Sequence, residues 1–361
     1  GYNLTKVGSG QVSIACARSL GAGVPYWNMN LGDVTINAGI LAFAESLTLG
    51  NPAKALTVNS DATLQLFDLN VTNPIVRNIT LNSARITSGG GDTDTNVVNG
   101  TIATTGANWF NLDQGAFIVN GAITGSGSLN ISGNGPGRVY LNGTSTYAGD
   151  TTVTNGTIGG TGVIPGNLVM LGGTNAPGMS LGTLTVNGSA TLAGTTLMEI
   201  DRGAAPNSDR LSVGGALNFG GILQVVLGAG AATPQGGDVY QLFNKGGSGS
   251  FTTIALPALA GGLTWNTANL TVNGTLSVLG ESPRPAITNV FLNGDKVVFS
   301  GAGGTAGNSY VVVSATSVVL PAASWTPVVT NVFGAGGTFS VTNTIEPAKP
   351  VNFFRLRVPT P

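Results

Sequence analysis

Residues 138–200 read RVYLNGTSTYAGDTTVTNGTIGGTGVIPGNLVMLGGTNAPGMSLGTLTVNGSATLAGTTLMEI, and this stretch decides the fold class. Short alternating runs, such as Leu184-Thr185-Val186, are interrupted every six to ten residues by Asn-Gly, Gly-Gly or Pro-Gly. Alternation places successive side chains on opposite faces, which is typical of half-buried β-strands. Asn and Gly accept positive φ at low cost, so these dipeptides predict turns. A helix of three turns is excluded by this glycine density.

The composition of the whole chain agrees with an all-β extracellular protein. Glycine accounts for 57 of 361 residues and charged residues for only 8%. A low charge can indicate disorder, but 42% hydrophobic residues argue against it here. Small β-forming residues take the place of the missing charges.

The charge pattern excludes several classes of partner. The net charge is −1, and 14 Lys and Arg residues are scattered along the chain. Nucleic-acid binding needs a basic stripe, so no nucleic acid is expected as a partner. No apolar run approaches about 18 residues, so no membrane insertion is expected either. A signal peptide is absent although the composition looks secreted, and we therefore expect Gly1 to be a processed or fragmentary start.

Cys16 is the single cysteine, so no intrachain disulfide can form. A lone cysteine in a secreted chain can pair between subunits, but the apolar run around Cys16 favours a small buried residue. Residues 1–30 hold a strand pair, 4–7 and 11–14, and then an atypical segment with Tyr26 and Trp27. We expect that segment to cap the first coil or to form a contact patch.

Residues 31–280 repeat the same pattern of short strands and turns, which predicts a β-solenoid. At 20–25 residues per coil, this region holds roughly ten to twelve coils, where a coil is one turn of the solenoid. The alternating apolar pairs that define its strands include Val34/Ile36, Leu56/Val58, Leu64/Leu66, Ile79/Leu81, Phe117/Val119, Leu129/Ile131, Leu211/Val213, Leu217/Phe219, Leu270/Val272 and Leu276/Val278.

A proline-rich linker at 281–285 separates the solenoid from a second domain, 286–361. Six longer strands are predicted there, with a hairpin turn at Asn293-Gly294-Asp295. Their number and length favour a small β-sandwich of the immunoglobulin or fibronectin type, with Trp325 as its core aromatic residue.

Five segments resemble parts of the autotransporter-associated β-strand repeat, also called the passenger-associated transport repeat. The run LTKVGSG at 4–10 is similar to the first half of that repeat, and residues 141–158, which contain Tyr147-Ala148-Gly149-Asp150-Thr151-Thr152-Val153, are similar to the second half. The run APGMSLGTLTV at 176–186 resembles the segment that often follows. Residues 209–215 and 261–265 look like the closing segment of the repeat.

The resemblance implies a right-handed parallel β-helix outside a bacterial cell. One departure is that members of the family end in a membrane β-barrel, whereas residues 286–361 resemble a small C-terminal domain of large secreted repeat proteins. Export of this chain through a barrel of its own is therefore not implied.

The sequence does not predict an enzyme. Without histidine, no triad of the usual kind and no imidazole metal site can form. A polysaccharide-degrading β-helix needs clustered carboxylates, and only Asp92/Asp94 and Glu199/Asp201 lie close together in sequence. The first pair fits a weak Ca²⁺ site or a solvated turn, and the second fits a surface salt bridge with Arg202 or Arg210. We predict no catalytic residue, no metal and no cofactor.

Asn-x-Ser/Thr sequons are frequent, for example at Asn70, Asn78, Asn99, Asn142, Asn187 and Asn273. Asn, Gly and Thr are also the residues that solenoid turns require, so most sequons are explained by turn chemistry. Regularly spaced outward Asn and Thr are predicted to form hydrogen-bonded ladders from coil to coil.

Three functions remain open. The first is a structural subunit that assembles with copies of itself, head to tail, into an extracellular fibre, sheath or surface layer. The second is a surface adhesin that presents the C-terminal domain or the Tyr26/Trp27 patch to a glycan. The third, a polysaccharide-degrading enzyme, is disfavoured by the sparse carboxylates. The sequence favours the structural subunit.

Overall fold

A computed structural model describes residues 1–15, 31–44, 49, 51–67, 69, 74–280, 285–346 and 351–358. The segments predicted to hold Cys16 and the Tyr26/Trp27 patch, and most of the predicted linker, lie outside these residues. The chain divides into two compact units, the first mainly 1–277 and the second mainly 278–361.

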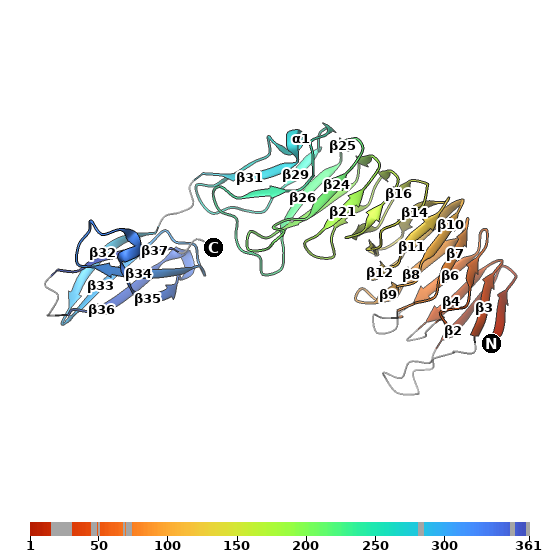
Figure 1. The fold of residues 1–361 in the computed structure, drawn as a ribbon, viewed down its shortest axis with the longest axis horizontal. Helices are drawn as coiled ribbons and strands as arrows, with labels where there is room; N and C mark the ends of the chain where they lie inside the picture. The colour runs from red at the N-terminus through yellow and green to blue at the C-terminus, as the bar shows by residue number, and fades with distance from the viewer. Residues whose placement is uncertain are drawn as a thin grey trace. The chain divides into compact units, whose positions relative to one another are not determined.

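Three long parallel sheets form the first unit (Figure 1). The six-stranded sheet consists of β1 (Tyr2–Lys6), β3 (Leu31–Ile36), β5 (Leu56–Val58), β7 (Ile79–Asn82), β10 (Ile102–Thr105) and β13 (Ile123–Gly125). The 11-stranded sheet consists of β2 (Gln11–Ala15), β4 (Ile40–Ala44), β6 (Thr63–Phe67), β8 (Arg85–Gly89), β11 (Ala107–Leu112), β14 (Ser128–Gly133), β16 (Thr151–Val153), β19 (Leu168–Met170), β22 (Ala190–Leu192), β25 (Leu217–Phe219) and β28 (Ser248–Gly249).

The third long sheet has eight strands and carries the site described below. Its strands, in spatial order, are β29 (Thr253–Ala255), β26 (Ile222–Leu227), β23 (Thr195–Ile200), β20 (Thr174–Pro177), β17 (Thr157–Gly160), β15 (Arg138–Leu141), β12 (Ala116–Val119) and β9 (Thr95–Val98). A three-stranded parallel sheet adds β18 (Val163–Ile164), β21 (Thr183–Val186) and β24 (Arg210–Val213). Each strand pairs with its equivalent in the next coil, as in a parallel β-solenoid.

The alternating sequence pattern places one set of side chains in the core and the other set on the surface. In β3 the burial alternates residue by residue, with Val34 and Ile36 fully buried. Because parallel pairing places Val34 opposite Leu56, and Leu56 opposite Ile79, the inward side chains stack into one continuous core. Ten of the 11 strands of the longest sheet, β4 to β28, lie in residues 31–280, in agreement with the ten to twelve coils predicted there.

Two strand predictions were wrong. The strands β1 and β2 do not pair with each other but with β3 and β4, because Gly8-Ser9-Gly10 turns a corner of a coil and sends the chain into another sheet. Residues Leu270–Asn273 form the one-turn helix α1 instead of a strand. Gly274, at φ 80°, ends that helix in the left-handed conformation that glycine adopts most easily. The strand β31 (Thr275–Leu279) follows, and its first residues pair antiparallel with β27 (Val239–Gln241).

The predicted asparagine ladders are confirmed. Asn59 donates to Asn37 over 2.8 Å, and Asn82 donates to Asn59 over 2.9 Å, so one side-chain amide per coil continues the line. A second ladder runs from Asn142 through Asn120 to Asn99. Two of the sequon asparagines, Asn99 and Asn142, therefore have a structural role on the solenoid surface.

The second unit contains two three-stranded antiparallel sheets. One holds β32 (Ala286–Asn293), β33 (Lys296–Ala302) and β36 (Phe339–Thr344); the other holds β35 (Thr326–Val332), β34 (Ser309–Ala315) and β37 (Phe353–Arg357). All six strands lie where the sequence predicts them, and the hairpin turn is confirmed by the pairing of Asn293 with Lys296.

One hydrophobic cluster draws side chains from both sheets, with Phe299 and Val341 from the first and Tyr310 and Val312 from the second. Trp325 is buried as predicted, but it belongs to a smaller cluster with Val311 and Val313. Those residues alternate with Tyr310 and Val312 and therefore face the opposite side of β34.

Candidate functional site

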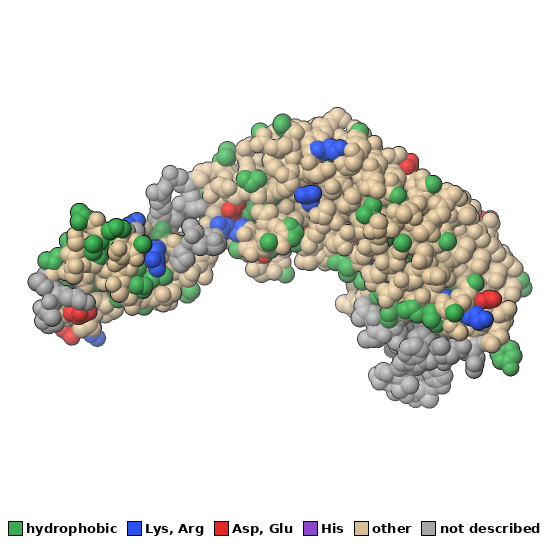
Figure 2. Space-filling model, in the orientation of Figure 1, with side chains coloured by type: hydrophobic (Ala, Val, Ile, Leu, Met, Phe, Trp, Pro, Cys, Tyr) green, Lys and Arg blue, Asp and Glu red, His purple; other side chains and the backbone are tan. Residues whose placement is uncertain are grey.

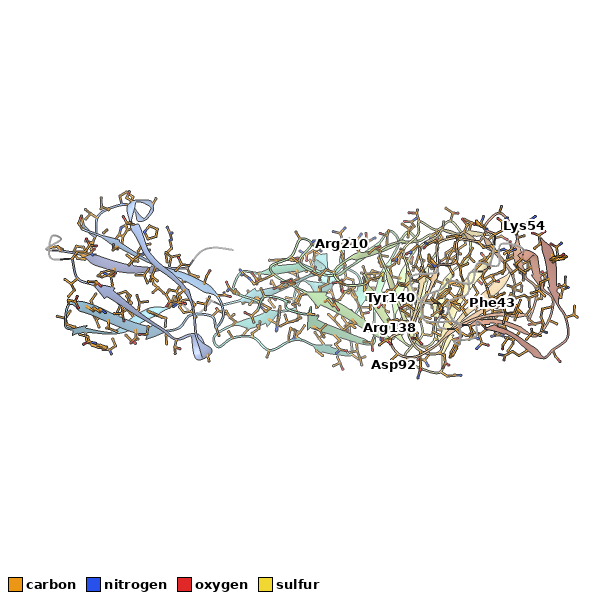
Figure 3. All side chains as sticks on the ribbon, turned by 90° about the horizontal axis from the view of Figure 1, so that it is seen from below. Phe43, Lys54, Asp92, Arg138, Tyr140 and Arg210 are labelled. Atoms are coloured by element: carbon orange, nitrogen blue, oxygen red, sulfur yellow. The ribbon has the colours of Figure 1, made fainter. Side chains whose placement is uncertain are left out.

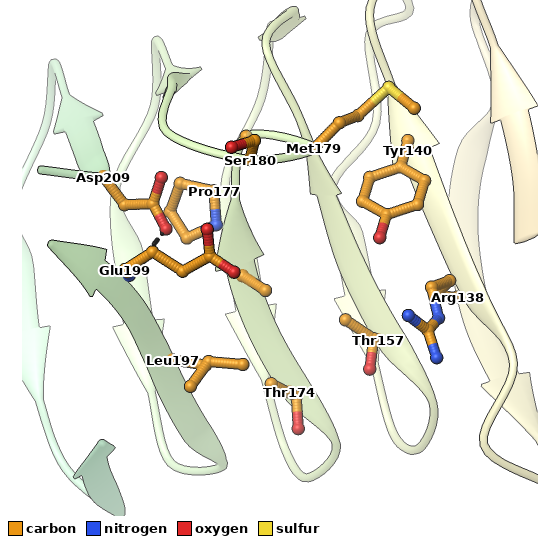
Figure 4. A pocket seen from close by; sticks show the side chains of 12 residues that line it. Arg138, Tyr140, Thr157, Thr174, Pro177, Met179, Ser180, Leu197, Glu199 and Asp209 are labelled. Atoms are coloured by element: carbon orange, nitrogen blue, oxygen red, sulfur yellow. Dashed lines mark hydrogen bonds between the residues drawn. The ribbon is translucent and has the colours of Figure 1, made fainter. Parts of the chain in front are cut away.

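A groove on the outer face of the eight-stranded sheet is a candidate site of the first unit (Figure 4). It crosses four neighbouring strands, β15, β17, β20 and β23, and encloses about 270 Å³. Its lining residues are Arg138, Tyr140, Thr157, Thr174, Ala176, Pro177, Gly178, Met179, Ser180, Leu197, Glu199 and Asp209. We refer to it as the β15–β23 groove.

The groove is hollow between Tyr140 and Leu197 because two small residues occupy successive positions of one row, and one of them, Ala176, lines the groove. Tyr140 pairs with Gly159, and Gly159 pairs with Ala176. In the next strand the row continues at Leu197, since Asn175 pairs with Thr196. Tyr140 and Leu197 therefore stand on either side of two positions that carry almost no side chain. A Cβ atom at Gly159 would clash with the backbone oxygen of Ala176, so this position also requires glycine.

A second row along the groove carries hydroxyl groups. Arg138 pairs with Thr157, and Thr157 pairs with Thr174. All three side chains point away from the core, because they alternate with the buried residues Val139, Ile158 and Asn175. Figure 3 locates Arg138 and Tyr140 on the same strand, two residues apart and therefore on the same face.

A loop after β20 closes one side of the groove. Gly160 and Gly178 exchange two backbone hydrogen bonds, of 2.8 and 2.9 Å, which fix the start of this loop. Gly178 has φ 84°, a conformation that favours glycine. Met179 and Ser180 are exposed on the loop, and Asn142 donates to the Met179 sulfur over 3.3 Å. The rim is thus tied to the coil of β15, two coils away.

The acidic end of the groove contains Glu199 and Asp209, whose side chains lie next to each other in Figure 4. Asp209 is 2% exposed, and its two oxygens accept backbone N–H groups of Gly182 (2.9 Å) and Glu199 (2.8 Å). Burial raises the pKa of Asp209 to about 7; the two hydrogen bonds oppose this rise, and the nearby Glu199 carboxylate adds to it. Asp209 therefore positions the loop and β23, while Glu199 is the carboxylate that remains half-exposed.

The carboxylate pairs selected from sequence have other surroundings. Asp201 does not line the groove, and its carboxylate accepts backbone N–H groups of Gly203 and Ala232. Asp94 accepts the backbone N–H of Gly91 and so closes the glycine loop, while Asp92 is exposed. Within the described ranges, no group of three or more His, Cys, Asp or Glu side chains is arranged to hold a metal ion.

Sequence reasoning missed Asp209, Arg138 and Tyr140 as residues of one site. Asp209 lies in one of the repeat-like motifs, and Gly182, whose N–H it accepts, lies in another. The presence of both motifs in one chain was the available sequence signal for this contact. The spacing between coils is irregular, 19 residues from Arg138 to Thr157 (157 − 138) and 17 from Thr157 to Thr174 (174 − 157). This irregularity conceals the rows that the pairing creates.

The comparisons with known proteins give one similarity. Over 181 residues, covering 41% of this chain, the sequence is 34% identical to the adhesin BmaC autotransporter of Brucella suis biovar 1 (strain 1330). The matched part is 5% of the length of that protein. No protein-family model and no solved structure matches the chain. Among the described residues, no helix is long and apolar enough to cross a membrane.

Proposed function

We propose that this chain acts in adhesion at a bacterial cell surface, as a non-catalytic β-solenoid that presents its outer faces to a partner. The observation that carries the proposal is the similarity to the Brucella adhesin. The stacked parallel sheets support it, since a solenoid offers an extended and rigid surface outside the cell. Charged side chains are few and scattered on the face shown in Figure 2, which leaves that face suited to short-range contacts.

The non-catalytic part of this proposal rests on the groove itself. Two carboxylates occur there, but both oxygens of Asp209 are engaged by backbone N–H groups and the residue is buried. A glycosidase requires two carboxyl groups that flank the scissile bond, one as acid and the other as base or nucleophile. Asp209 is held in place as a structural group instead.

Three finer features belong to the same proposal. We infer that the coils wind in the right-handed sense and that the second unit is an immunoglobulin- or fibronectin-like sandwich, which the core cluster shared by both sheets supports. We also propose the domain boundaries predicted from the sequence, which are 1–30, 31–280, 281–285 and 286–361. Assembly into a fibre, sheath or surface layer from copies of this chain stays a prediction.

Beads coated with the purified chain test the proposed function. We expect them to be retained on cultured animal cells, on extracellular matrix or on bacterial lawns more strongly than beads coated with an unrelated protein of equal mass. Retention equal to that control on all three surfaces would contradict a role in adhesion.

A further inference from the structure

We propose that the β15–β23 groove binds one or two sugar units of an uncharged glycan, with Tyr140 stacked on a sugar ring and Arg138 and Glu199 bonded to its hydroxyl groups. This inference rests on the proposed adhesive function and names its ligand class and its contact site. The ligand chemistry follows from the shape, the lining and the charge of the groove.

The size of the groove fits a small ring compound. Its volume of about 270 Å³ lies just below the range of ~300–1,000 Å³ that is typical of pockets for larger organic ligands. The groove crosses four strands, and three strand spacings of ~4.8 Å give a length of ~14 Å. A site that crosses four strands suits a short piece of a chain-like ligand that runs from coil to coil.

The residues that line the groove offer both kinds of contact that bind a sugar, an apolar surface and hydrogen-bonding groups. A pyranose has apolar C–H faces and a periphery of hydroxyl groups. The half-buried ring of Tyr140 provides an aromatic surface, and Leu197 stands across the two small floor residues. Arg138 donates and Glu199 accepts hydrogen bonds at opposite ends, and charged partners form the stronger hydrogen bonds. The hydroxyls of Thr157 and Thr174 lie between these two ends, and each can donate or accept a hydrogen bond.

The charges of the lining select against other ligands. Arg138 contributes one guanidinium, Glu199 contributes one carboxylate, and the buried Asp209 carboxyl has a pKa raised to about 7, so the groove carries little net charge of either sign. A nucleic acid or a polyanionic glycan would bring its charges against Glu199 without the basic stripe that such ligands require. A lipid chain would leave Arg138 and Glu199 buried without partners, at a cost of several kcal/mol.

The groove is organised before any ligand binds. The bonds between Gly160 and Gly178 hold the rim, and those from Gly182 and Glu199 to Asp209 join the far end of the loop to β23. The contact of Asn142 with Met179 ties the rim to the coil that carries Tyr140. Little conformational freedom remains to be lost on binding, and this favours affinity in a small site.

A glycan array probed with the full chain identifies ligands, and calorimetry with the best uncharged oligosaccharide measures affinity. Two variants probe the groove. Tyr140→Ala removes the aromatic surface, and Ala176→Leu fills the floor from an outward-facing position. Each should weaken binding by at least about tenfold, as expected for an anchoring contact.

Two matched variants serve as controls. Trp109→Ala removes a half-buried aromatic residue that faces outward from β11, in a different sheet. Thr80→Leu adds the same side chain as Ala176→Leu at an outward-facing position of β7, in the six-stranded sheet. Both controls should bind within about twofold of the original chain, because surface substitutions away from a site have small effects. Circular dichroism and the thermal midpoint confirm that each variant is folded.

The possible failures are distinguishable. Undiminished binding by folded Tyr140→Ala and Ala176→Leu would overturn the groove as the site and leave the adhesive function intact. Adhesion of coated beads without binding to any uncharged glycan would overturn the ligand class. A loss of binding only in Trp109→Ala would place the site on the other sheet.

Discussion

Arg77 shows how one residue joins several coils of the solenoid. It is 1% exposed, and its guanidinium donates to the backbone oxygens of Gly32, Leu49, Lys54 and Ala55. Burial lowers the pKa of Arg77, and the carboxylate of Asp33 opposes this effect. A buried cation is tolerated here because its N–H groups are satisfied by four backbone carbonyl oxygens, of which that of Ala55 also accepts the N–H of Val34.

We predict that Arg77→Met lowers the free energy of unfolding by roughly 2–4 kcal/mol, because it leaves buried carbonyl groups unsatisfied. Urea unfolding measures the change. Arg85→Met is the matched control, since Arg85 lies over the outer face of Trp109, with its guanidinium carbon 4.7 Å from the ring centroid. That control should cost less than about 1 kcal/mol. Equal losses in the two variants would contradict the role assigned to Arg77.

The raised pKa of Asp209 predicts that the stability of the fold depends on pH. Its pKa is raised to about 7 in the folded chain from an ordinary value of 3.8. The protonated carboxyl therefore adds stability that is complete below pH ~4 and is lost as the pH rises through about 7, with an upper bound on the order of 4 kcal/mol. The free energy of unfolding, measured from pH 4 to 8, should fall less in Glu199→Gln, because the neighbouring charge that raises the pKa is gone. Parallel curves for the original chain and Glu199→Gln would contradict this coupling.

At the scale of single elements, the asparagine ladders link coils outside the backbone hydrogen bonds. Asn59 is the central member of its ladder, since it donates to Asn37 and accepts from Asn82. Each such bond joins residues 22 or 23 positions apart, and so connects neighbouring coils. The ladder thereby adds side-chain contacts in the direction in which the solenoid grows.

We predict that Asn59→Ala lowers the free energy of unfolding by about 1–2 kcal/mol, because two hydrogen bonds are lost. Asn134→Ala, at an exposed turn position outside both ladders, should change it by less than about 0.5 kcal/mol. Thermal unfolding of the two variants, followed by circular dichroism, compares them directly. A smaller loss for Asn59→Ala than for Asn134→Ala would show that the ladder does not stabilise the coils.

The buried hydrogen bond between Tyr147 and Thr151 explains one of the repeat-like motifs. Both side chains are buried, and burial raises the pKa of Tyr147 to about 12. Gly149 lies between them, and a Cβ atom there would approach the backbone of Gly127 and Ser128 to 2.7 Å. The Tyr-x-Gly-x-Thr pattern is therefore a packing requirement of the coil.

At the scale of the whole molecule, a low net charge accompanies the continuous stacking of the coils. A net charge of −1 removes long-range repulsion between neighbouring surfaces, so short-range contacts decide what the solenoid binds. The inward residues are mostly aliphatic and aromatic, and the outward faces carry Thr, Asn and few charges. A function that needs a surface rather than a reactive centre fits this distribution.

The sequence by itself determined the β class, the turns, the asparagine ladders and all six strands of residues 286–346 and 351–358. These features depend on local alternation and on turn residues, which are read directly from neighbouring positions. The tertiary structure alone decided that Asp209 meets Gly182 and that Tyr140, Gly159 and Ala176 form one row. The reason is coil length: Thr151 pairs with Leu168, 17 residues away (168 − 151), whereas Asn218 pairs with Ser248, 30 residues away (248 − 218). With coils of unequal length, a local pattern does not fix which residues become neighbours, and only the stacking of the core does.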